Sequence, residues 1–114
     1  MSDVAISVFV FAIYLFVTGI GFVFIPNKIL PLFKFPKTNE PWIPILGIVI
    51  VTIGFYYLTA AQNELMVFFW ATIVTRSVVC ICFILFVVTK KSPPALAIFG
   101  LIELAGAIWT YLAF

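Results

Sequence analysis

The chain has 114 residues, of which 66% are hydrophobic and 9% charged, and its formal net charge is +2. Average soluble domains are about 45–50% apolar and about 25% charged. A domain this small leaves much of its surface in water, so it cannot bury such an excess of apolar side chains. The composition excludes an ordinary soluble domain and predicts an integral membrane protein of the all-α class.

Four apolar stretches are long enough to cross a bilayer, for which about 20 residues suffice. They cover roughly residues 4–25, 42–61, 65–88 and 94–114. Little chain remains between them, so we expect a single transmembrane domain over residues 1–114, folded as a four-helix antiparallel bundle. The first stretch is preceded by Asp3 rather than a basic region, and it is long for a signal peptide. We therefore expect it to be retained as a helix.

The connections between these stretches differ in length. The turn at residues 62–64 is very short, which predicts a tight antiparallel hairpin of the second and third helices. Residues 26–41 form the only long loop and alternate lysines with apolar residues. Such a segment is suited to the membrane interface, where its lysines reach headgroups and its apolar side chains dip inward. An ordinary linker is the alternative.

Two charged residues lie near the middle of apolar stretches, Arg76 in the third and Glu103 in the fourth. A charge at the centre of a bilayer costs about 2.5–3.5 kcal/mol on insertion scales. Consecutive antiparallel helices would bring the two side chains to nearly one depth, from which arginine cannot reach either interface. We therefore predict that Arg76 and Glu103 pair directly, because a guanidinium offers a carboxylate a bidentate geometry.

Helical periodicity places further polar residues beside this pair. Thr72 and Arg76 share one face of the third helix, and Glu103 lies among small residues on the fourth. Tyr14 on the first helix and Tyr57 on the second lie on the faces expected to point inward. These five residues form the predicted site, which is either a ligand-binding site or a structural ion pair.

Three hypotheses for function follow from this site. In the first, the protein binds a lipophilic or amphiphilic small molecule, of the lipid or quinone type, at Arg76 and Glu103. In the second, it is a structural or accessory subunit of a membrane complex, or a homo-oligomer, and the ion pair is a folding lock. In the third, it carries ions or protons. Membrane lipids are expected partners in each case, and the modest net charge does not suggest nucleic-acid binding.

Enzymatic chemistry is not indicated. The chain has no histidine, which excludes imidazole metal sites and histidine acid–base catalysis, and it carries no recognisable catalytic motif or metal-ligand set. Cys80 and Cys82 are two residues apart and would point in different directions on a helix, so they cannot form a disulfide with each other. We expect no cofactor.

Several short segments form a recognisable pattern, namely residues 39–43, 46–47, 54–57, 60–61 and 99–110, together with Arg76. This pattern resembles that of the small bacterial four-helix membrane proteins grouped as DoxX-like. The resemblance covers nearly the whole chain, although none of its motifs is catalytic. It implies a four-helix bundle in the bacterial inner membrane, with Arg76 and Glu103 at family positions. The association of the DoxX name with quinol-linked complexes implies a quinone-type ligand, but the chain has no ligands for haem, flavin or iron–sulfur clusters.

The distribution of lysine predicts the orientation. All five lysines lie in the first and third loops, namely Lys28, Lys34, Lys37, Lys90 and Lys91. By the positive-inside rule these loops are cytoplasmic, and both termini are extracytoplasmic. A protease-sensitive tag at either terminus should be cleaved from the outside of intact spheroplasts. Cleavage only after the membrane is permeabilised would show that the termini are cytoplasmic and would contradict the predicted orientation.

Overall fold

The computed structural model describes residues 1–114, apart from the side chain of Phe33. Four long helices make up most of it: α1 (Asp3–Phe24), α3 (Trp42–Gln62), α4 (Met66–Val88) and α5 (Leu96–Ala113). Each is long and apolar enough to cross a membrane. The longest dimension of the molecule is 40 Å, which exceeds the hydrocarbon thickness of about 30 Å. The predicted all-α class is confirmed.

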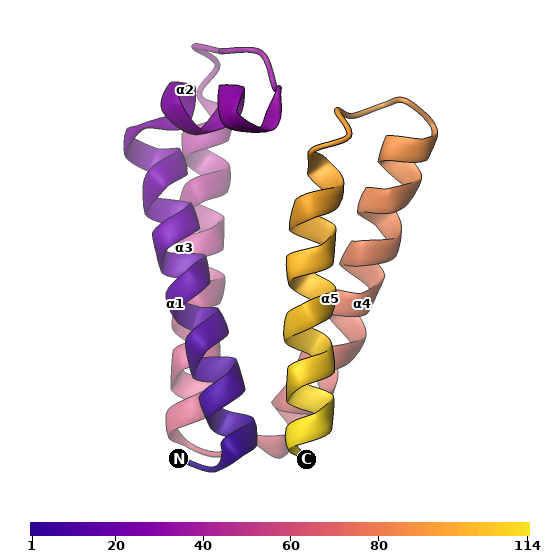
Figure 1. Ribbon diagram of the computed structural model, residues 1–114. Coiled ribbons are helices and arrows are strands. Elements are labelled where there is room, and N and C mark those ends of the chain that lie inside the picture. Colours follow the sequence, from indigo (N-terminus) through magenta and orange to yellow (C-terminus); the bar gives the residue numbers. More distant parts are fainter.

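The long helices run alternately up and down and associate as two pairs (Figure 1). α1 packs along α3, and α4 packs along α5. α3 and α4 are joined by a short turn but have few contacts with each other. The prediction of a tight hairpin between these two helices is therefore wrong. A short turn brings two helix ends together, but it does not close the angle between the helix axes.

The pair α1–α3 is close because glycines meet at its crossing. A Cβ atom added to Gly19 would lie 2.7 Å from the carbonyl oxygen of Gly47, and one added to Gly47 would lie 2.6 Å from that of Gly19. Glycine at both positions lets the two backbones approach as they do in other membrane helix pairs. α1 and α3 therefore form a tightly packed unit.

The helix faces opposite the predicted inward faces are exposed. On α4 this face consists of Val67, Val74, Val78, Ile81 and Leu85, each at least half exposed. The opposite face of α4 is buried through Phe69, Thr72, Arg76 and Cys80. On α5, Ala107 and Thr110 are buried whereas Ile108 and Leu112 are exposed. The helical periodicity thus gave the inward faces correctly.

The connection between α1 and α3 is folded rather than extended. It begins with a short helix, α2 (Pro26–Ile29), and a 3-10 turn, η1 (Leu30–Phe33). Leu30 is buried, whereas Leu32 is exposed. The side chain of Asn27 accepts a hydrogen bond from the backbone N–H of Thr38 at 2.9 Å. This compact segment lies across the end of the α1–α3 pair that is opposite the chain termini (Figure 1).

At the other end, the N-terminus is tied to the turn between α3 and α4. The carboxylate of Glu64 accepts hydrogen bonds from the backbone N–H of Ser2 at 2.7 Å and from its hydroxyl at 2.6 Å. These bonds lower the pKa of Glu64 below its ordinary value. Ser2 also caps α1 by accepting a bond from the N–H of Ala5. The tie connects the start of α1 to the turn that joins the two helix pairs.

The glycine crossing gives a prediction about stability. Gly19→Ala should lower the free energy of unfolding in detergent by about 1–3 kcal/mol, because the new methyl group meets the α3 backbone. Gly21→Ala is the matched control, since its added Cβ meets only the flexible end of Ile29. Denaturant titration monitored by circular dichroism measures both. Equal midpoints for the two variants would contradict a close crossing at Gly19.

Candidate functional site

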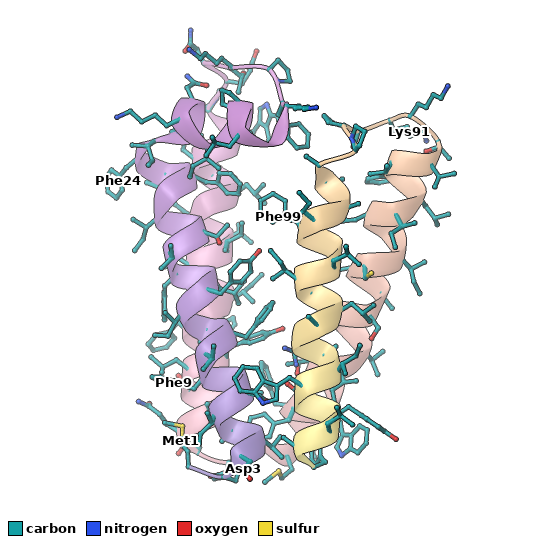
Figure 2. All side chains as sticks on the ribbon, viewed as in Figure 1. Met1, Asp3, Phe9, Phe24, Lys91 and Phe99 are labelled. Carbon is teal, nitrogen blue, oxygen red and sulfur yellow. The ribbon has the colours of Figure 1, made fainter. Side chains whose placement is uncertain are left out.

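A cavity of about 970 Å³ lies between the two helix pairs. We call it the interhelical cavity. Its walls are mostly apolar and come from all four long helices, as the side chains of Leu15, Ile50, Val79 and Phe99 illustrate. Figure 2 shows Phe99 on the side of α5 that faces the α1–α3 pair, whereas Phe24 points away from the bundle. Ile29, Leu30 and the residues from Phe35 to Thr38 line the end covered by α2 and η1.

All five residues of the predicted site line this cavity. They are Tyr14 of α1, Tyr57 of α3, Thr72 and Arg76 of α4, and Glu103 of α5. Tyr14, Arg76 and Glu103 lie near the middle of their helices, and Tyr57 and Thr72 lie closer to the turn between α3 and α4. All five are far from the loop that carries Lys37. We call the part of the cavity lined by these five residues its inner end. The structure thus brings together, from all four long helices, the polar residues that the sequence analysis singled out.

Arg76 is 2% exposed and is held by hydroxyl and carbonyl groups. Its Nε donates to the carbonyl oxygen of Thr72 at 3.1 Å. Its Nη2 donates to the hydroxyl of Thr72 at 3.0 Å and to the hydroxyl of Thr110 at 2.8 Å. The guanidinium therefore bridges α4 and α5 through neutral acceptors.

The hydroxyl of Thr110 continues this network to α1. It lies 2.8 Å from the hydroxyl of Ser7, which itself donates to the carbonyl oxygen of Val4 at 2.6 Å. Since a serine hydroxyl has a single proton, Thr110 must be the donor to Ser7. The bonds then run in one direction, from Arg76 to Thr110, Ser7 and Val4, and each polarises the next. We call this set the hydroxyl chain.

The predicted direct pair of Arg76 and Glu103 is not formed. None of the hydrogen bonds of Arg76 reaches Glu103, and its Nη1 has no hydrogen-bond partner among the residues that the structure describes. The two groups interact only through longer-range coulombic attraction, without direct contact. The Cα–Cβ bonds of a helix tilt toward its own N-terminus. α4 and α5 run in opposite directions, so the side chains of Arg76 and Glu103 start at one depth but diverge.

The position of Gly106 confirms where the guanidinium lies. A Cβ atom added at Gly106 would be 3.0 Å from Nη1 of Arg76 and 3.0 Å from the ring of Phe11. Gly106 lies about one helical turn beyond Glu103, toward the chain terminus. The centre of the guanidinium is 4.8 Å from the centroid of the Phe11 ring. The cation therefore occupies a slot that an aromatic face and a glycine leave open.

Aromatic rings surround the inner end. The Phe11 ring lies 5.1 Å from that of Tyr14 and 5.8 Å from that of Tyr57. Tyr57 also meets Phe68 of α4 edge to face at 5.3 Å. Tyr57 is buried, and Tyr14 is partly exposed to the cavity. These rings give the inner end of the cavity a rigid, mostly apolar wall.

The predicted site did not include Thr110, Ser7 or Phe11, which surround Arg76 in the structure. Thr110 lies seven residues after Glu103, on the same face of α5 and about two turns closer to the terminus. The tilt of arginine toward the N-terminus of its helix was the available signal, since it directs Arg76 to the level of Thr110 rather than Glu103.

The two cysteines are free thiols. Cys80 is buried against α5, near Gly100, and Cys82 is exposed on the outer surface. Cys82 therefore faces away from the interhelical cavity, which neither thiol lines.

No protein-family model, curated protein or solved structure matches this chain.

The hydroxyl chain gives a prediction about folding. Thr110→Val should lower the free energy of unfolding by about 1–2 kcal/mol, because it leaves Nη2 of Arg76 and the hydroxyl of Ser7 each short of a partner. Thr52→Val is the matched control. Thr52 is exposed and its hydroxyl bonds only a carbonyl oxygen of its own helix, so its effect should stay within about 0.5 kcal/mol. Indistinguishable unfolding curves for the two variants would show that the chain does not stabilise the bundle.

Proposed function

We propose that this protein binds a lipophilic or amphiphilic small molecule, of the lipid or quinone type, in the interhelical cavity. One observation carries the proposal. A large, mostly apolar cavity ends at Arg76 and Glu103, and these two charged residues form no hydrogen bond with each other. A cavity that served packing alone would need no polar groups at its inner end.

The size of the cavity supports a ligand. Small-molecule sites typically enclose about 300–1,000 Å³ and combine apolar walls with a few convergent polar groups. The interhelical cavity, at about 970 Å³, is at the upper end of that range. Its volume suits a molecule with a long apolar part better than a small polar metabolite.

Access from the bilayer also favours a lipophilic ligand. The cavity is lined by both α3 and α4, and these helices have few contacts with each other. An apolar molecule could pass between them from the hydrocarbon region without crossing water. The hydroxyl chain joins α1, α4 and α5, whereas α3 takes no part in it.

The alternative of a structural subunit draws on a different observation. Arg76 connects α4 to α5, and Thr110 extends the connection to α1. The residue therefore has a folding role through its hydroxyl partners, in place of the ion pair expected from the sequence. A folding role for Nε and Nη2 is compatible with ligand binding, because it leaves Nη1 and Glu103 unused.

We also propose that the protein resides in the bacterial inner membrane with both termini outside, as a member of the DoxX-like group. Both termini lie at one end of the molecule, and the loops that carry the lysines lie at the other, where Figure 2 shows Lys91. This arrangement supports the positive-inside orientation.

A cavity-filling substitution tests the proposal. Val79 lines the cavity, and its neighbour Val78 is half exposed on the outer surface. Val79→Phe should reduce the amount of lipid or quinone retained by gently extracted protein about tenfold, because the added ring occupies the ligand's volume. Val78→Phe should leave retention unchanged. Native mass spectrometry of the two variants gives the measurement. Wild-type protein that retains no apolar molecule, or equal retention by both variants, would refute binding in this cavity.

A further inference from the structure

The inner end of the cavity indicates what kind of polar group its ligand carries. Arg76 and Glu103 line it as one cation and one anion, and among the described residues no other Asp, Glu, Lys or Arg lies on that part of the wall. Lys37 and Glu40 line the same cavity, but they lie in the loop at the opposite end. The formal charges of the inner end therefore cancel.

Each of the two charged groups keeps hydrogen-bonding capacity that the protein does not use. Nη1 of Arg76 has two N–H groups, and no described residue accepts a hydrogen bond from them. Glu103 forms no hydrogen bond with any residue that the structure describes, and its carboxylate can accept several. A group that satisfies both needs an acceptor for the arginine and a donor for the glutamate.

We infer that the ligand is an uncharged amphiphile whose polar end carries both a hydroxyl donor and an oxygen acceptor. This inference rests on the proposed function. A monoacylglycerol has this chemistry. An anionic headgroup would bring a negative charge toward Glu103, and a cationic one would bring a positive charge toward Arg76. A zwitterionic headgroup would leave the aqueous interface for mid-bilayer depth, which costs more than moving hydroxyls there.

The remaining walls agree with this class. Tyr14, Tyr57 and Thr75 carry hydroxyls and also line the cavity. The hydroxyl of Thr75 donates to the carbonyl oxygen of Thr72, so it can serve a ligand only as an acceptor. Tyrosine hydroxyls both donate and accept, so they can adapt to a hydroxylated polar end. Apart from Thr18 and Tyr56, the remaining walls up to the loop are apolar, which suits a long hydrocarbon chain.

A ligand panel with one common chain tests the inference. Purified wild-type protein is titrated with monopalmitoylglycerol, palmitate, hexadecyltrimethylammonium and palmitoyl lysophosphatidylethanolamine, and occupancy is read by native mass spectrometry. Monopalmitoylglycerol should bind about tenfold more tightly than each of the other three, because only it satisfies both groups without adding charge. Equal or tighter binding of any charged or zwitterionic member would overturn the inference.

A charge-neutralising variant tests the role of Glu103 separately. Glu103→Gln leaves Arg76 as the only charge at the inner end. The ratio of the affinity for palmitate to the affinity for monopalmitoylglycerol should therefore rise about tenfold. Glu64→Gln is the control, because Glu64 lies outside the cavity at the α3–α4 turn, and its ratio should match the wild-type ratio. An unchanged ratio in Glu103→Gln would also overturn the inference. The wild-type panel stands on its own if that variant fails to fold.

The panel separates this inference from the proposed function. If all four ligands bind alike and Val79→Phe abolishes their binding, the cavity is a binding site and only the assigned class is wrong. If none of the four binds and extracted protein retains no apolar molecule, the proposed function fails and the inference fails with it.

Discussion

A guanidinium inside a hydrocarbon medium must find its hydrogen-bond partners within the protein, and that requirement organises this bundle. Arg76 is almost completely buried and uses acceptors on α4 and α5, while Thr110 passes the network on to Ser7 of α1. The two helix pairs are therefore joined near mid-depth by a charged side chain whose hydrogen-bond partners are neutral groups.

The cavity follows from a difference between packing within the pairs and packing between them. Within the α1–α3 pair, Gly19 and Gly47 bring two backbones into contact. Between the pairs, the residues that face each other above Arg76 are separated by about 970 Å³ of space. α2 and η1 cover the far end of this space. A bilayer does not drive apolar surfaces together as water does, so such a gap is tolerated in a membrane bundle.

The offset between Arg76 and Glu103 changes what the two charges can do. A closed ion pair satisfies itself and leaves little for a ligand, and its main value is in specifying how helices pack. Here the arginine takes hydroxyl partners one to two turns away, toward the termini, and the glutamate remains at the cavity wall. Under the proposed function, the structural and binding roles fall to different atoms of the same arginine side chain.

The sequence by itself determined the four helices, their inward faces and the residues of the inner end. Hydropathy and helical periodicity are local properties, and in a bilayer they decide which segments span as helices and which faces turn inward. It also placed Arg76 and Glu103 near mid-depth, since their distances from the helix ends follow from counting. It did not determine that α1 pairs with α3 and α4 with α5, or that Arg76 bonds Thr110 instead of Glu103. Those outcomes were decided by the tertiary structure. Helix pairing depends on surfaces that are remote in the sequence, and antiparallel neighbours tilt their side chains in opposite directions, so equal depth along the backbone is not contact between side chains.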